Sequence, residues 1–346
     1  MKNALARALA ACSLALPLAL APDPSSACSV CLAGDPQFST HGATSQEAGS
    51  FSFYLEALGF RKTSGLLPHG GEGADPEAGD HEHGDHEGDG DAHAGEHGGV
   101  ERSRGQRLDL YASWTPIDRL TLTLDVPFAW NRIVESEGAS RSTSTLSGFG
   151  DVALASSVVL WRDRDVMPST WLEGRLWLKT PTGRDESEVD GTPDPHLQPG
   201  TGSWDFGGGL AAVHRRSWGS LYASAFYREN TPGALDYTHG DVFLANLAVE
   251  VPVGHAASQP ALDWLTVGLE LNFRYAGYDD AGGQRYQDSG GSILYATPSV
   301  RVRLPWSFGE RTPSLRAAVQ LPLTQDWLHG FQREKEVWSV GILVPF

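Results

Sequence analysis

Residues 120–130 read LTLTLDVPFAW, and every second residue from Leu120 to Trp130 is apolar. Successive side chains of a β-strand point to opposite faces, so this stretch predicts a strand with one wholly apolar face and one largely polar face. The same alternation recurs over residues 265–275 and 294–304. Proline disrupts a strand interior, so Pro298 in the last stretch predicts a bulge or a local break.

Twelve segments of this kind follow one another along the chain. They lie at residues 50–61, 105–115, 119–130, 148–161, 170–180, 203–215, 219–228, 241–251, 264–275, 292–304, 312–321 and 335–346. Each is close to the roughly 9–11 residues of a tilted membrane-spanning strand. In lipid every backbone polar group must be paired within the protein, and bacterial barrels have an even number of strands. We therefore predict an all-β fold, a transmembrane antiparallel up-and-down β-barrel of 12 strands.

The connections between the segments provide a second indication. The odd-numbered connections are long and the even-numbered ones are mostly short, with 252–263 as the exception. The long ones cover residues 62–104, 131–147, 181–202, 229–240, 276–291 and 322–334. Long outer loops and short periplasmic turns are typical of outer-membrane barrels. A soluble pair of β-sandwiches, the alternative for a chain of this length, has no reason to sort its loops in this way.

Composition agrees with this fold class. Apolar residues make up 40% of the chain, and its mean hydropathy is −0.28. A barrel that alternates apolar and polar residues has an average composition like that of a soluble protein. Aromatic residues near the predicted strand ends would suit the two membrane interfaces. They are Trp114, Trp130, Trp161, Tyr227, Trp264, Tyr275 and Trp338. The net charge of −17 disfavours nucleic acid as a partner.

The start of the chain predicts export. Residues 1–27 combine the basic residues Lys2 and Arg7 with an apolar stretch and small residues before Cys28, as in a cleaved signal peptide. We expect residues 28–49 to form a short periplasmic N-terminal segment ahead of the barrel at 50–346. Cys28 and Cys31 would then form a C-x-x-C pair, which could be a disulfide, a soft metal site or an inert pair. These features place the protein in the outer membrane of a Gram-negative-type bacterium.

The last predicted strand carries one apolar face that ends at Phe346. The residues of this face are Trp338, Val340, Ile342, Val344 and Phe346. The pattern resembles the C-terminal segment that outer-membrane proteins present to their assembly machinery. We expect that machinery and outer-membrane lipid to be partners of the protein.

Three glycine-rich phrases extend the resemblance to one family. They are Gly148-Phe-Gly-Asp151, Lys179-Thr-Pro-Thr-Gly183 and Pro199-Gly-Thr-Gly-Ser-Trp-Asp-Phe206. With the barrel pattern from about residue 105 onward, they resemble the outer-membrane transporter family named after the MetA pathway of phenol degradation. The resemblance implies a barrel that handles small solutes, with hydrophobic ones as one option, and it does not fix a substrate. The long first loop of this chain departs from that family.

The polar face of the predicted strands would line the lumen. The lumen-lining residues on this register are Asp109, Asp125, Glu173, Arg175, Lys179, Glu270, Arg274, Arg301 and Arg303, with Glu56, Arg107, Asp151, Asp205, Arg228, Glu250 and Arg316 as further members. Eight strands leave an interior filled by side chains, and 16 to 18 leave an open channel, so 12 predict a narrow pore. A polar conduit for small solutes and a plugged barrel whose charges only hold its wall both fit these residues.

The first long loop, residues 62–104, has an unusual composition. Between Asp75 and His97 it contains nine carboxylates, five histidines and no Lys or Arg, which predicts a disordered segment. Imidazole and carboxylate groups bind Zn²⁺, Cu²⁺ or Ni²⁺, so we expect weak, exchangeable metal binding here. The candidate metal ligands are His81, His83, His86, His93, His97, Asp80, Glu82 and Asp85. A solvated acidic loop without a metal is the alternative.

These observations together predict an outer-membrane channel or transporter for small solutes, or for metal ions captured by the first loop. We predict no enzymatic activity and no required cofactor. His214, His239 and His329 lie near strand ends, but no nucleophile motif accompanies them, so a hydrolase is a remote alternative. A plugged barrel that acts as a metal or ligand receptor without transport is the closer alternative.

Overall fold

The structure is a computed structural model that describes residues 47–66, 100–137, 140–189, 192–287, 289–307, 311–328 and 333–346. The predicted signal peptide, both cysteines of the C-x-x-C pair and the predicted metal ligands of the first loop lie outside these residues. In the described part of the chain, no helix combines the length and the apolar character needed to cross a membrane.

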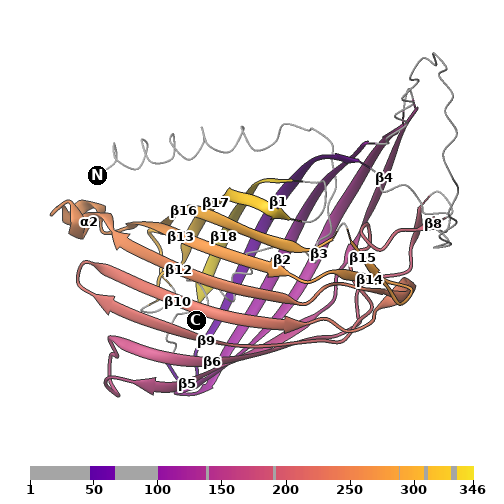
Figure 1. The fold of residues 1–346 in the computed structure, drawn as a ribbon. Coiled ribbons are helices and arrows are strands. Elements are labelled where there is room, and N and C mark those ends of the chain that lie inside the picture. The colour runs from indigo at the N-terminus through magenta and orange to yellow at the C-terminus, as the bar shows by residue number, and fades with distance from the viewer. Residues whose placement is uncertain are drawn as a thin grey trace, which may run out of the picture.

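Thirteen strands form one large antiparallel sheet (Figure 1). They are β1 (Phe51–Leu66), β2 (Val100–Ile117), β3 (Leu120–Glu137), β4 (Ser140–Phe149), β5 (Ala153–Arg162), β6 (Thr170–Lys179), β9 (Asp205–Arg216), β10 (Gly219–Glu229), β12 (Val242–Pro252), β13 (Leu265–Ala276), β16 (Gly291–Arg303), β17 (Ser314–Leu328) and β18 (Glu334–Pro345). The strands pair in chain order, and β18 pairs back with β1 through partners such as Phe53 and Val344. The sheet is therefore a closed barrel, which confirms the predicted fold class.

The barrel has twelve strand positions, because β4 and β5 share one. β3 pairs with β5 over residues 120–125 and with β4 over residues 128–137. The prediction of a single strand at 148–161 was therefore wrong: residues 150–152 interrupt it. At the interruption, a Cβ on Gly150 would lie 2.9 Å from the Pro199 carbonyl oxygen, so another segment approaches the backbone too closely for a regular strand with side chains.

The prediction of outer loops at 131–147 and 322–334 was also wrong, because most of these residues lie in strands. β3 continues to Glu137, β4 begins at Ser140, and β17 continues to Leu328. β1 and β2 likewise extend into the predicted loop 62–104, as far as Leu66 and Val100. Apolar alternation ends where lipid contact ends, while backbone pairing continues beyond it. Residues 140–145, SRSTST, therefore form part of a strand although they show no apolar alternation.

Pro298 also behaves differently from the prediction. β16 continues through Pro298, which pairs with Leu269 on β13. The irregular register of β16 with β17 lies instead between Ser292 and Tyr295, and Tyr295 faces Pro322. The proline that accompanies the irregularity is therefore the one in β17.

Short elements occupy the remaining connections. At the outer end these are β7 (Glu188–Val189), β8 (Thr192–Pro193), η4 (Ala234–Asp236), β11 (Tyr237–Thr238), β14 (Asp279–Ala281) and β15 (Gln284–Tyr286). At the opposite end, α2 (Val253–Ala256) and η5 (Pro260–Leu262) lie between β12 and β13. β11 pairs with β14, so two outer connections are joined to each other.

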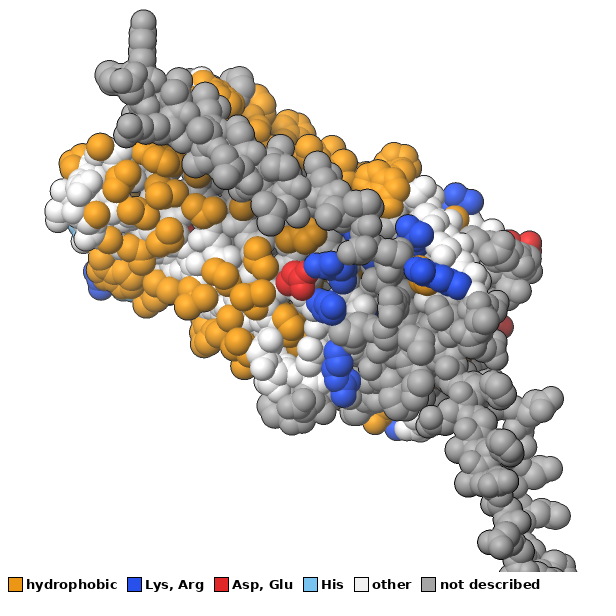
Figure 2. Space-filling model, turned by 90° about the horizontal axis from the view of Figure 1, so that it is seen from above, with side chains coloured by type: hydrophobic (Ala, Val, Ile, Leu, Met, Phe, Trp, Pro, Cys, Tyr) orange, Lys and Arg blue, Asp and Glu red, His pale blue; other side chains and the backbone are white. Residues whose placement is uncertain are grey.

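The two faces of the wall differ as the alternation predicted. On β3, Leu124 and Trp130 are 42% and 43% exposed, whereas Asp125 and Asn131 are 5% and 0% exposed. Figure 2 shows the outward side chains as a broad hydrophobic band on the surface of the barrel. Apolar side chains thus face the lipid, and polar side chains face the interior.

Small residues allow the inner layer to pack closely. A Cβ on Gly341 of β18 would lie 2.2 Å from the Tyr54 hydroxyl oxygen, so the Tyr54 ring occupies the space above this glycine. The Phe60 ring covers Gly105 and the Phe226 ring covers Gly207 in the same way. Aromatic rings over glycines of neighbouring strands therefore fix the register of the wall.

Candidate channel interior

The inner face of the barrel gathers charged side chains of both signs. Of the nine residues predicted to line the lumen, seven are buried, Arg301 is partly buried and Arg303 is exposed; the buried ones are Asp109, Asp125, Glu173, Arg175, Lys179, Glu270 and Arg274. Arg303 lies at the end of β16 and donates to the Asp263 backbone carbonyl. The residues that alternate with apolar lipid-facing positions are thus packed inside the wall.

One charge pair lies on β6. Arg175 Nη2 lies 3.1 Å from Glu173 Oε2, and Arg175 Nη1 donates to the Tyr222 hydroxyl at 3.0 Å. The Trp171 indole donates to the other Glu173 oxygen at 2.6 Å. Each of these side chains is almost fully buried. A buried charge must be paired and hydrogen-bonded, and this group meets that condition.

A second set of charges spans β12 to β18. Arg316 Nη2 donates to Glu270 Oε1 at 2.7 Å, and Arg301 Nη2 donates to Glu250 Oε1 at 2.7 Å. Arg274 pairs with Glu334 nearer the outer end. These pairs cross between strands, so they link the wall around its inner circumference.

Two carboxylates face each other on β1 and β2. Glu56 and Asp109 are direct partners in the register and are 1% and 0% exposed. Arg107 Nε lies 2.7 Å from the Asp109 carboxylate, and the Tyr54 hydroxyl donates to Glu56 at 3.1 Å. Two acidic groups therefore lie side by side at this point of the interior, with Arg107 next to one of them and the Tyr54 hydroxyl next to the other.

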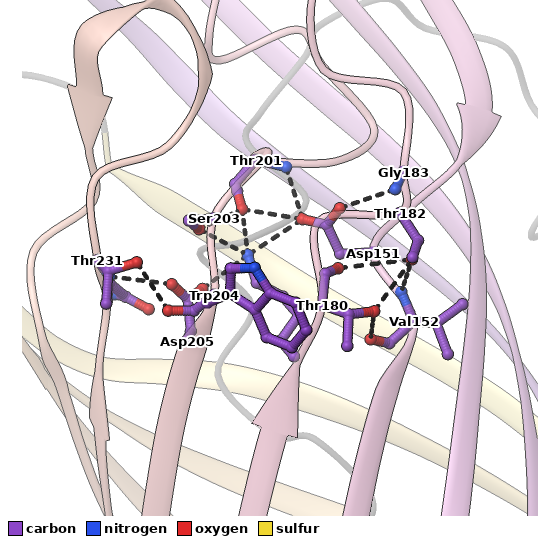
Figure 3. A network of polar contacts seen from close by, with 12 residues as sticks. Asp151, Val152, Thr180, Thr182, Gly183, Thr201, Ser203, Trp204, Asp205 and Thr231 are labelled. Atoms are coloured by element: carbon purple, nitrogen blue, oxygen red, sulfur yellow. Dashed lines mark hydrogen bonds and ion pairs between the residues drawn. The ribbon is translucent and has the colours of Figure 1, made fainter.

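The most connected group lies where the wall is interrupted (Figure 3). Asp151 Oδ2 accepts hydrogen bonds from the Thr201 amide at 2.7 Å and the Thr201 hydroxyl at 2.9 Å. Asp151 Oδ1 accepts one from the Gly183 amide at 2.9 Å. Asp151 thus holds both ends of the connection between β6 and β9.

Lys179 adds a positive charge to this group. Its Nζ lies 3.1 Å from Asp151 Oδ2 and 2.6 Å from Asp205 Oδ2, and it donates to Ser203 at 3.1 Å. We call Asp151, Lys179, Thr201, Ser203 and Asp205 the Asp151 cluster. The three phrases that carry the family resemblance supply all five residues, so motifs distant in the sequence form one structural unit.

The connection that the Asp151 cluster holds lies against the inside of the barrel. The Asn131 side chain on β3 donates to the carbonyl oxygens of Leu197 at 3.1 Å and Gln198 at 3.2 Å. Leu197 is 1% exposed and packs with Ile133 and Leu146. We had predicted residues 181–202 only as an outer loop. The sequence signal for this contact is the polar Asn131, which lies on the inner face of β3 opposite a glycine-rich connection.

A group of rings lies at the outer end, near the same connection. The Tyr237 ring lies 5.1 Å from the His196 ring and 4.9 Å from the His239 ring, between centroids. The pKa of His239 is lowered to about 4, mainly by burial and to a smaller extent by His196, Lys179 and Arg228, while Asp279 opposes the shift. Neutral His239 is therefore the stable form at physiological pH. Among the described residues, no group of three or more His, Cys, Asp or Glu side chains is arranged to hold a metal ion.

A closed antiparallel barrel with apolar side chains outward and charged side chains inward defines an outer-membrane β-barrel protein. Residues 97–314 match the family described as "Putative MetA-pathway of phenol degradation", and the chain belongs to that family. No curated protein matches the chain as a relative.

One solved outer-membrane barrel shares the fold, and a second is less similar. The COG4313 outer membrane channel from Pseudomonas putida F1 has a TM-score of 0.56 and 16% identity, over 87% of this chain and 97% of that chain. A Pseudomonas aeruginosa FadL homologue has a TM-score of 0.36 and 12% identity, over 86% of this chain and 89% of that chain. The family match and the shared fold together make this protein an outer-membrane β-barrel of that family.

Proposed function

We propose that the protein is a narrow outer-membrane channel for small solutes and that residues 180–204 constrict its outer mouth. The observation that carries this proposal is the contact of Asn131 with the Leu197 and Gln198 carbonyls inside the barrel. A connection bound to the inner wall takes up cross-section that a solute would otherwise use. The Asp151 cluster anchors both ends of the connection, which supports a fixed constriction.

Below this constriction, a solute would pass charged pairs. One pair, Arg175 with Glu173, lies on β6, and a second pair, Arg316 with Glu270, joins β17 to β13. Each pair presents both signs of charge to the lumen. Small polar or zwitterionic solutes would exchange water for these groups at low cost, whereas large or strongly charged ones would not. Transport in this scheme is diffusion through the lumen, without a cofactor or a catalytic step.

Conductance in planar bilayers tests the constriction. We expect small, steady conductance from the folded wild type and several-fold larger conductance after deletion of residues 186–196, which leaves both anchors in place. Deletion of residues 257–262, which follow α2 and include η5 at the other end, is the matched control and should leave conductance near the wild-type value. Equal conductance of the wild type and the 186–196 deletion would refute the constriction.

A receptor without transport is the second candidate. It is supported by the burial of the lumen charges, since Glu56, Asp109 and Glu173 are each no more than 4% exposed. Folded protein that gives neither bilayer conductance nor solute uptake in liposomes would favour this candidate over the channel.

We further propose that the acidic, His-rich stretch of the first loop captures divalent metal ions at the cell surface. The proposal is supported by its five histidines and nine carboxylates within residues 75–97. Zinc titration of the folded protein should show several weak sites that disappear when residues 75–97 are deleted. Unchanged binding in the deletion variant would exclude the loop as the metal site.

A further inference from the structure

Three arginines form a row on the outer surface of the barrel. Arg61 on β1 faces Arg104 on β2, and Arg104 faces Arg132 on β3. On β3 the alternation places Arg132 on the same side as Trp130 and Leu124, which are exposed, and opposite Asn131, which is buried. The row therefore points away from the lumen. Side chains directly opposite on neighbouring strands lie about 5 Å apart at Cβ, so the three cations are close neighbours.

The row lies at the edge of the lipid-facing surface. The next row inward consists of Gly59, Gln106 and Trp130, and the one after it of Ala57, Leu108 and Phe128. Phe51, ten residues from Arg61, is stacked on Trp114 at the other edge of the band. Ten residues of a strand tilted by about 40° rise about 26 Å, close to the apolar height of about 25 Å in such barrels. The row thus marks the outer interface, where lipid headgroups begin.

The row brings three positively charged side chains next to one another. Arg61 forms an ion pair with Glu336 on β18, and Arg132 is exposed. Like charges directly opposite on neighbouring strands destabilise each other, so this arrangement favours an additional anion. Figure 2 shows Lys and Arg side chains gathered where the hydrophobic band ends.

We propose that Arg61, Arg104 and Arg132 bind the phosphate groups of an outer-leaflet lipid. Guanidinium groups pair with phosphate through two parallel hydrogen bonds, which suits several arginines in one row. Immediately below the row, the Phe128 ring lies 4.5 Å from the Trp130 ring and 5.1 Å from the Phe149 ring, between centroids. An apolar surface below a cationic row fits one molecule with acyl chains and a phosphorylated headgroup. A free anion would use only the row, and this continuity therefore favours a lipid.

Lipid A, with two phosphates, is the probe for this site. Its affinity for the folded protein in neutral detergent is compared between the wild type and the double variant Arg104→Gln, Arg132→Gln. We expect at least tenfold weaker binding by the variant, and a loss of wild-type affinity as salt is raised. The matched control, Arg164→Gln with Arg216→Gln, removes the same charge from exposed positions at the opposite end of the barrel and should bind like the wild type. The heat-dependent mobility of the barrel in gels reports folding of each variant, and the single variant Arg132→Gln replaces the double one if the latter does not fold.

Two further probes separate the sources of phosphate. Lipid A from which the phosphates have been removed should bind at least tenfold more weakly than lipid A, and inorganic phosphate should not compete at millimolar concentration. Equal affinity of the wild type and the arginine variant would overturn the proposal. Equal affinity for the dephosphorylated lipid, or competition by inorganic phosphate at low concentration, would overturn it as well.

Discussion

Lys179 Nζ lies 2.6 Å from Asp205 Oδ2, with both side chains buried, and the same nitrogen reaches Asp151. One ammonium group therefore balances two carboxylates at the interruption of the wall. Replacing Lys179 by Met would leave both carboxylates buried without their cation. Loss of one partner of a buried ion pair costs about 3–5 kcal/mol. We expect Lys179→Met to lower the free energy of unfolding in urea by about that amount.

Arg216→Met is the control for this variant. Arg216 is exposed at the end of β9 and contacts His214. Its loss should change the free energy of unfolding by less than about 0.5 kcal/mol. Equal stability of the two variants would mean that the Asp151 cluster does not hold the wall together.

Glycines beneath aromatic rings provide a test of packing. A Cβ at Gly341 would lie 2.2–2.6 Å from atoms of Tyr54, whereas at Gly208 the nearest atom is 3.6 Å away. We expect Gly341→Ala to destabilise the barrel by about 1–3 kcal/mol, because the Tyr54 ring must move within a packed interior. Gly208→Ala should be neutral. Urea unfolding of both variants measures the difference, and similar values for the two would show that the Tyr54 ring adapts freely.

The sequence predicted the wall because lipid imposes a strict alternation on it. Leu120–Trp130 was assigned to a strand with the correct inner and outer faces, and Asp125 lies inside as expected. Beyond the lipid the alternation is no longer required. For this reason Ser140–Thr145 and the end of β17 were read as loops although their backbones are paired.

The interior group at Asp151 could not be derived in the same way. Its residues come from the break before β5, the end of β6, the segment before β9 and the first residue of β9, and no periodicity relates Asp151 to Thr201. The resemblance identified the motifs that contain these residues, but their contact is a tertiary property. Likewise, the inward course of residues 181–202 depends on the Asn131 side chain, which an alternation pattern records only as polar.

Acidification should loosen the outer connections through His239. Burial lowers its pKa from 6.5 to about 4, so in the unfolded segment His239 gains a proton at a higher pH than in the folded one. The contribution of neutral His239 to the free energy of unfolding is fully present above pH 6.5. It falls progressively between pH 6.5 and 4, by at most about 3 kcal/mol. Hydrogen exchange of the amides in residues 230–241 should therefore quicken over this range. His239→Gln should remove the dependence, and an unchanged pH profile in that variant would exclude His239 as its origin.

Ion selectivity should depend on the Arg316–Glu270 pair if the lumen conducts. The two groups are 2.7 Å apart and buried on the inner face, so each neutralises the field of the other. Glu270→Gln would leave the positive charge of Arg316 unbalanced in a medium of low dielectric constant, where its field on a passing ion is strong. We expect the reversal potential under a salt gradient to shift toward anion selectivity. Arg316→Gln should shift it toward cations, and the double variant should return it close to the wild-type value. Reversal potentials that are identical in all four proteins would mean that ions do not pass this part of the lumen.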